Sequence, residues 1–209
     1  MDEPWDCIVI GGGAAGLSAA LALGRARRRT LVIDGGGQSN LAAAGIGGLL
    51  GHDHRPPAEL YAAGRDELAR YPSVAVRDER VTALGGASGG FSVALAGGAS
   101  ERARTVLLAT GSDYERPDVP GVAERWGGTV FHCPFCHGYE VRDRRVVQIV
   151  THPMGLHTTP LFRQLTSELT VVIHDTAGIK LVRMNAGTFM MGSRESPQQV
   201  AAAFDEPES

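Results

Sequence analysis

A Gly-x-Gly-x-x-Gly loop near the N-terminus constrains the fold more than any other feature of this chain of 209 residues. The loop, formed by Gly11, Gly13 and Gly16, follows an apolar run at residues 7–10 that is typical of a strand buried on both faces. Small and helix-favouring residues at 17–23 come directly after it. This order of strand, tight turn and helix predicts the first half of a β-α-β unit with a parallel sheet.

A second apolar run at residues 30–33 completes the unit and ends at Asp34. In such a loop the first glycine permits a tight turn, the second lets a pyrophosphate approach the backbone, and the third lets helix and strand pack closely. A carboxylate at the end of the second strand can accept hydrogen bonds from an adenosine ribose. A dinucleotide of unspecified kind is therefore expected, and a glycine turn that binds nothing is the weaker alternative. The predicted contacts are Gly11, Gly13, Ala14, Ala15, Gly16, Asp34 and Gly35.

Further apolar runs extend the pattern along the chain. Pro56 and Pro57 are expected to open a helix that runs to about residue 70, because proline is tolerated in a first helical turn. Residues 155–165 are expected to form another helix. Runs rich in strand-forming residues predict strands at 74–76, 80–84, 91–95, 105–109, 146–150 and 169–173.

This alternation of strands and helices predicts an α/β fold with two domains and a tail. The first domain is expected to be Rossmann-like, and the second is a shortened nucleotide-binding-type domain that carries a pair of cysteines. The tail is expected to be irregular. These segments are residues 1–116, 117–175 and 176–209.

Composition excludes several classes of protein. A formal net charge of −3 without a basic stripe favours neither nucleic acid nor a membrane surface as a partner. No apolar run approaches the roughly 20 residues that cross a bilayer, and the acidic N-terminus is not a secretory signal. Three cysteines are too few for a disulfide scaffold, so a cytoplasmic protein is expected.

A Cys-x-x-Cys pair, Cys133 and Cys136, is the second chemical feature, and His132 and His137 flank it. Two thiols at this spacing can close into a disulfide, and a neighbouring histidine can act as the base or as a stabilising cation. The same four residues could bind zinc, but no second Cys-x-x-Cys is present, so redox chemistry is favoured over a metal. Cys7 lies in the first apolar run and is expected to be a core residue.

Together these motifs resemble the thioredoxin reductase-like branch of the FAD-dependent pyridine nucleotide-disulfide oxidoreductases. The resemblance rests on the glycine loop with Asp34 and on residues 49–60, 107–111 and 133–140, in that order. It implies an FAD-binding domain at residues 1–116, in which Thr110 and Gly111 also contact FAD.

The resemblance also implies roles and partners. Cys136 is expected to face the flavin, and Cys133 is expected to attack the substrate. The implied function is disulfide or dithiol oxidoreduction with a thioredoxin-like protein or a small-molecule disulfide or dithiol. A homodimer is implied because relatives are usually dimers.

The spacer between the cysteines points to one branch of this family. A proline and an aromatic residue between the cysteines, followed by His-Gly-Tyr-Glu, look closer to oxidases of small-molecule dithiols than to ordinary thioredoxin reductases. Under that alternative, electrons pass from a dithiol through the cysteines and FAD to oxygen. His132 and His137 are then the candidates for proton transfer.

Two departures from the family pattern concern the second half of the chain. Residues 151–155, after the strand expected at 146–150, contain a single glycine, which leaves NADPH use open because a pyrophosphate needs the early glycines. Residues 180–209 resemble the start of a formylglycine-generating or sulfatase-modifying domain instead of the family's final segment. A truncated, non-catalytic remnant that binds a flavin or nucleotide is therefore a further alternative.

Overall fold

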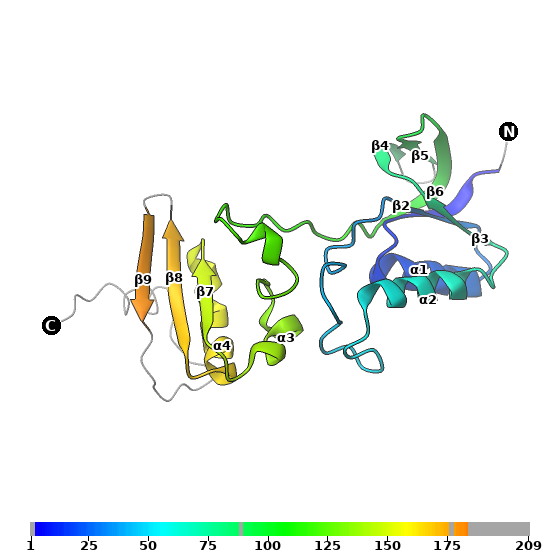
Figure 1. Cartoon of the computed structure of the whole chain (residues 1–209). Coiled ribbons are helices and arrows are strands. Elements are labelled where there is room, and N and C mark those ends of the chain that lie inside the picture. Colours follow the sequence, from blue (N-terminus) through cyan, green and yellow to red (C-terminus); the bar gives the residue numbers. More distant parts are fainter. Residues whose placement is uncertain (1–2, 88–89, 176–177, 184–209) are drawn as a thin grey trace. The chain divides into compact units, whose positions relative to one another are not determined.

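The computed structural model describes residues 3–87, 90–175 and 178–183 (Figure 1). The chain forms two compact units, Met1–Val130 and Phe131–Ser209. This division lies beyond residue 116, where the sequence places the domain boundary. One physical reason is the packing of Gly127, where a Cβ would overlap the backbone and side chain of Ala42, so that the segment before Val130 adheres to the first unit.

A six-stranded sheet in the order β3-β2-β1-β6-β5-β4 forms the first unit. The strands β1, β2, β3 and β6 pair in parallel, and β4 and β5 extend the sheet by antiparallel pairing. The expected α/β, Rossmann-like fold is confirmed. In chain order the elements are β1 (Trp5–Ile10), α1 (Ala14–Arg25), β2 (Thr30–Asp34), α2 (Pro57–Leu68), β3 (Val74–Asp78), β4 (Val81–Ala87), β5 (Gly90–Leu95), β6 (Ser100–Leu108) and the short helix η1 (Ala123–Arg125).

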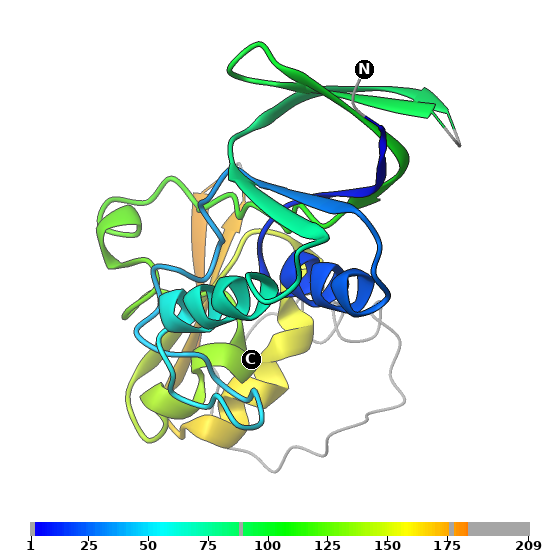
Figure 2. The ribbon, with the colours of Figure 1, turned by 90° about the vertical axis from the view of Figure 1, so that its right-hand side faces the viewer.

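Both faces of β1 and β2 are buried, which explains why the sequences of these two parallel strands carry continuous apolar runs. Successive residues of β1 point to opposite faces, so Cys7 and Val9 pack against α1 and α2, whereas Ile8 and Ile10 pack against β5. Figures 1 and 2 show α1 and α2 side by side on one face of these strands. Cys7 is 6% exposed, which confirms it as a core residue.

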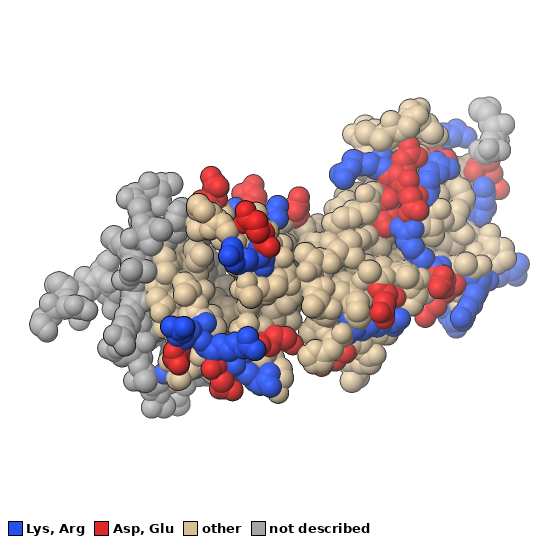
Figure 3. All heavy atoms as spheres, viewed as in Figure 1, with Lys and Arg blue, Asp and Glu red and all other residues tan. Residues whose placement is uncertain are grey.

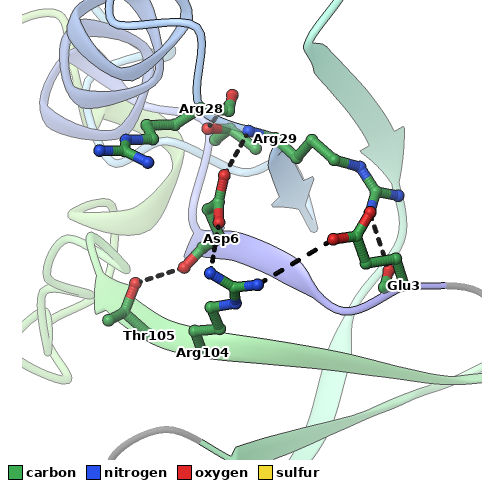
Figure 4. A network of polar contacts seen from close by, with 7 residues as sticks. Glu3, Asp6, Arg28, Arg29, Arg104 and Thr105 are labelled. Carbon is green, nitrogen blue, oxygen red and sulfur yellow. Dashed lines mark hydrogen bonds and ion pairs between the residues drawn. The ribbon is translucent and has the colours of Figure 1, made fainter.

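A polar network fixes the start of β1, at the end of the sheet opposite the glycine loop (Figure 4). One carboxylate oxygen of Asp6 accepts the backbone N–H of Arg29 at 3.0 Å, and the other lies 3.6 Å from the guanidinium of Arg104. The hydroxyl of Thr105 donates to the Asp6 carbonyl at 2.7 Å. These contacts join β1 to the start of β2 and to β6. They therefore help to fix the register of these three strands.

Replacement of Asp6 by alanine is expected to destabilise the first unit by about 1.5–3 kcal/mol, since a backbone N–H loses a charged acceptor. Thermal or urea unfolding followed by circular dichroism measures the change. Glu3→Ala is the matched control, because the Glu3 side chain is 70% exposed and its ion pair with Arg29 is expected to contribute at most about 1 kcal/mol. Equal effects of the two substitutions would contradict this account.

The second unit contains a sheet in the order β7-β8-β9, in which β7 and β8 are parallel and β8 and β9 antiparallel. Phe162 of α4 packs against Val150, Leu169 and Val171 in its core. Its elements are α3 (Pro134–His137), the short helix η2 (Tyr139–Val141), β7 (Val146–Val150), the 3₁₀ helix η3 (Pro153–Thr158), α4 (Thr159–Leu165), β8 (Leu169–Asp175) and β9 (Gly178–Arg183).

Two sequence-based expectations differ from the second unit. The helix expected at 155–165 begins as the 3₁₀ helix η3 and becomes α-helical only at Thr159. The tail expected to be irregular contains β9, which pairs along the edge of β8; residues 184–209 lie outside the described part of the chain.

The surface of the chain is mixed in charge. Acidic and basic side chains are interspersed on the face that Figure 3 displays. Among the described residues, no helix has both the length and the apolar composition for crossing a membrane.

Candidate functional site

A pocket of about 600 Å³ lies in the first unit at the carboxyl ends of β1, β2 and β6. Its volume falls within the range of small-molecule and cofactor sites. Eight of the nine residues that the sequence assigns to a dinucleotide line this pocket together; the ninth, Gly16, lies behind it. The eight are Gly11, Gly13, Ala14, Ala15, Asp34, Gly35, Thr110 and Gly111.

Close backbone packing explains the glycines of the loop. Gly11 has a φ of 108°, and a Cβ there would overlap the carbonyl oxygen of Ala109. A Cβ on Gly16 would overlap the carbonyl oxygen of Gly11, so α1 can begin directly against the strand only with glycine at this position. Gly13 is different, because its nearest neighbour would be the Gln38 side chain at 3.7 Å.

The first turn of α1 offers backbone N–H groups to the pocket. Gly13 is the N-cap of α1 and has no side chain with which to cap the helix. The amides of the first turn have no partner within a helix, and those of Ala14 and Ala15 belong to residues that line the pocket. Such a helix start is suited to an anion such as a pyrophosphate.

Asp34 lies at the end of β2 with its side chain 5% exposed. Its carboxylate accepts hydrogen bonds from the amide of Gly36 at 3.1 Å, from Gln38 Nε2 at 3.1 and 3.2 Å, and from Arg65 Nη2 at 2.5 Å. Burial acts to raise the pKa of Asp34, but the hydrogen bonds from Arg65, Gly36 and Gly12 outweigh it and hold the pKa below its ordinary value. An ionised carboxylate that is paired with Arg65 therefore lies in the pocket that the start of α1 also lines.

These residues fit the FAD that the family resemblance implies. The glycine loop and the start of α1 would hold the pyrophosphate, and Asp34 would face the ribose. Sequence reasoning did not find several other lining residues, because no local pattern marks them. They include Gln38, Asn40, Tyr61, Glu79, Arg80 and Val81.

The cysteine pair lies in the second unit at the start of α3. Cys133 is the N-cap of this four-residue helix, and both thiols are free and half-buried. Partial burial, together with a hydrogen bond to Cys133 and the charge of Cys133, raises the pKa of Cys136 to about 11. At neutral pH Cys136 therefore keeps its proton, and its thiol is a poor nucleophile without a base.

The two histidines have different surroundings. His137 stacks on Phe131 at 5.5 Å between ring centroids, and Phe131 contacts Phe162 of the core at 6.2 Å. Both ring nitrogens of His137 are buried without a hydrogen-bond partner. Burial, and to a lesser extent the neighbouring His137, lowers the pKa of His132 and so favours its neutral form.

Tight packing also explains the glycine that follows the motif. A Cβ on Gly138 would overlap the Pro134 carbonyl oxygen and the Leu165 side chain. Within the described part of the chain, no three side chains of His, Cys, Asp or Glu come together as a metal site would require.

The loop after β7 does not fit a pyrophosphate. The amide of Met154 donates to His152 Nδ1 at 3.2 Å, and the amide of Gly155 donates to the His152 carbonyl at 2.8 Å. Gln148, which is buried, donates to the carbonyl oxygen of Gly155 at 2.9 Å. The amides of Met154 and Gly155 are thus used within the loop, and Gly155 is the single glycine of residues 151–155, so the early glycines that let a pyrophosphate approach the backbone are missing.

Comparisons with known proteins agree on one family. The sequence pattern of the pyridine nucleotide-disulphide oxidoreductases matches residues 5–191. Thioredoxin reductase tcpT of Claviceps purpurea is 35% identical over 153 residues, which cover 72% of this chain and 48% of that protein. The thioredoxin reductase of Treponema pallidum is 31% identical over 175 residues, which cover 82% of this chain and 56% of that protein.

A solved structure of an oxidoreductase is also similar to this chain. An oxidoreductase from Agrobacterium tumefaciens superposes with a TM-score of 0.78 at 41% identity, covering 81% of this chain and 57% of that chain. The chain thus spans about half the length of the relatives that it matches.

Proposed function

The chain belongs to the pyridine nucleotide-disulphide oxidoreductase family, and we propose that it is an FAD-dependent oxidoreductase that interconverts disulfides and dithiols through Cys133 and Cys136. The observation that carries the proposal is the pair of free, half-buried thiols of Cys133 and Cys136 at the start of α3, in a chain whose first unit holds a pocket lined by the glycine loop and Asp34. Two thiols at this spacing can form a disulfide, as a nucleophile and its resolving thiol require.

In the proposed reaction the two sulfurs act in sequence. The Cys133 thiolate attacks one sulfur of a substrate disulfide, and a mixed disulfide forms while the other substrate sulfur leaves as a thiolate. Cys136 then loses its proton and attacks Cys133, which releases the substrate dithiol and leaves a Cys133–Cys136 disulfide. Two electrons move from the cysteine pair to the substrate, and the reverse sequence oxidises a dithiol.

FAD, when bound, exchanges those two electrons with the cysteine pair. The residues of the first unit are proposed to hold it: the loop with Gly11, Gly13 and Gly16 at the pyrophosphate, Asp34 at the ribose, and Thr110 and Gly111 as further contacts. Since the pKa of Asp34 is lowered, its carboxylate is ionised and can accept ribose hydroxyl hydrogens across the neutral range.

His132 and His137 are proposed to move the proton of Cys136. A thiol with a pKa of about 11 is a poor nucleophile at neutral pH, so the resolving step requires a base. His132 is suited to this role because burial lowers its pKa and favours the neutral ring. His137 stands next to Cys136 in the chain, and its unpartnered ring nitrogens can take up the proton.

A second candidate function is the oxidation of a small-molecule dithiol with oxygen as the electron acceptor. The loop of residues 151–155 favours it, because the amides of Met154 and Gly155 bond within the loop and the early glycines that the pyrophosphate of NADPH needs are missing. In this direction the dithiol supplies two electrons and two protons, and oxygen takes them up to form hydrogen peroxide. A non-catalytic remnant that only binds a nucleotide is the third candidate.

The proposal also covers the partner, the cellular compartment and the oligomeric state. A thioredoxin-like protein or a small-molecule disulfide or dithiol is the proposed partner, with the chain in the cytoplasm as a homodimer. Two of the relatives are named thioredoxin reductases, and this name gives a protein as the substrate.

The test is a spectral titration of the FAD-loaded chain without oxygen. Dithiothreitol is expected to bleach the visible flavin absorbance, whereas NADPH at the same concentration leaves it unchanged. Readmission of oxygen should restore the colour, and peroxide should accumulate with excess dithiol. Bleaching by NADPH would overturn the oxidase candidate in favour of a reductase. If the dithiol does not bleach a flavin-loaded sample, the non-catalytic remnant is the one candidate that stays.

A further inference from the structure

Arg65 of α2 bridges two carboxylates at the edge of the pocket. Its Nη2 lies 2.5 Å from Asp34 Oδ2, and its Nη1 lies 2.6 Å from Asp78 Oδ1. Asp34 and Asp78 are register partners at the carboxyl ends of the parallel strands β2 and β3. Two like charges are therefore placed side by side by the sheet, and a single guanidinium from the neighbouring helix neutralises their repulsion.

The geometry gives Arg65 a specific task at Asp34. The Asp34 side chain is 5% exposed, whereas that of Asp78 is 75% exposed, so only Asp34 depends on protein groups to stay charged. Its neighbours Gly36 and Gln38 are neutral donors. A buried carboxylate without a cation takes up a proton at a higher pH, and it then offers fewer acceptors to a ribose.

We propose that Arg65 is a positioning residue for the cofactor: it keeps Asp34 ionised and aims its carboxylate into the pocket without contacting FAD itself. This inference rests on the proposed FAD site. It assigns a function to a residue outside the glycine fingerprint, and it explains why α2 carries an arginine at this position. Because the guanidinium fork reaches both carboxylates at once, a lysine ammonium can replace its charge but not its two-point geometry.

The charged groups that face the Asp34 carboxylate come from two elements and the loop after β3. Arg65 approaches from α2, and Asp78 lies at the end of β3. Glu79 and Arg80 follow β3 and line a cleft of about 290 Å³ with Asp34. Glu79 and Arg80 have opposite charges. When Arg65 is lost, burial and the charge of Asp78 therefore both oppose the ionisation of Asp34.

The experiment compares wild type with Arg65→Met and Arg65→Lys across roughly pH 5 to 8, a range in which a buried carboxyl without its cation can titrate. FAD binding is followed by flavin fluorescence, and the Asp34 carboxyl is titrated by NMR in the FAD-free protein. The ratio of the variant's Kd to the wild-type Kd is expected to grow for Arg65→Met as the pH falls, by up to about tenfold per pH unit for one proton. Arg65→Lys should restore the pH profile in part.

The controls separate this role from a general loss of stability. Arg70→Met removes an exposed arginine just beyond the end of α2 and should leave the binding profile unchanged. In an Asp34→Asn background, Arg65→Met should add no pH dependence, because the group through which it acts is gone. This double variant also serves if Arg65→Met alone fails to fold.

Each outcome has one meaning. If wild type binds no FAD, the proposed function fails while the NMR titration still tests the link between Arg65 and Asp34. If wild type binds FAD and Arg65→Met shows the same pH profile and the same Asp34 titration as wild type, the inference is overturned. A pH-independent loss of binding in Arg65→Met that persists with Asp34→Asn would also overturn it, since Arg65 would then act by another route.

Discussion

A chain with Gly16 replaced by alanine is expected to bind FAD roughly 100-fold more weakly, equivalent to about 2.8 kcal/mol, and to melt at a lower temperature even without the cofactor. The new Cβ would overlap the carbonyl oxygen of Gly11, which is backbone and cannot rotate away. Helix α1 must then shift from β1, which costs about 1–3 kcal/mol. The same shift displaces the amides at the start of α1 from the pyrophosphate position.

The matched control lies in the same loop. Gly13→Ala makes the same chemical change, but its Cβ meets only the Gln38 side chain at 3.7 Å. This variant should melt like wild type without FAD, and should lose affinity only because the methyl group stands where a phosphate approaches. Gly85→Ala, in β4 and with open space around it, should change neither property. If Gly16→Ala melts like Gly13→Ala, the packing argument for the third glycine is wrong.

The sequence predicts the fold where the physical signal is local. Strands β1 and β2 are buried on both faces, so an unbroken apolar run marks each of them, and the glycine loop marks the turn between. Strand β9 was missed because it is an edge strand that forms a hairpin with β8, and its own short sequence carries no clear strand pattern. The 3₁₀ start of the helix after β7 was missed because hydrogen bonds of Gln148 and His152 determine it.

The same distinction holds for the site. Asp34 could be found because its distance from the glycine loop is fixed by one β-α-β unit. Arg65 could not, because its contact with Asp34 depends on the rotation of α2 over a sheet formed by other segments. The raised pKa of Cys136 is also invisible in the spacing, since it follows first from burial and then from the neighbouring Cys133.

Serine at Cys133 or Cys136 is expected to lower disulfide or dithiol turnover on the order of 10³-fold or more, because each removes a covalent partner of the reaction. The two variants should nevertheless differ. Cys136→Ser keeps the attacking sulfur and loses the resolving one, so a disulfide substrate should remain attached to Cys133 and be visible by mass spectrometry. Cys133→Ser should trap much less at neutral pH, since burial still raises the pKa of Cys136.

Cys7→Ala provides the control for the cysteine variants, because Cys7 is buried in β1 and takes no part in the proposed chemistry. It should turn over like wild type with a small loss of stability. Trapping at Cys136 in place of Cys133 would reverse the roles of the two sulfurs. The pH dependence adds a sharper test. Cys133→Ser removes the hydrogen bond and the charge of Cys133, so that burial alone raises the pKa of Cys136, and this variant should trap more substrate as the pH rises and the Cys136 thiol loses its proton.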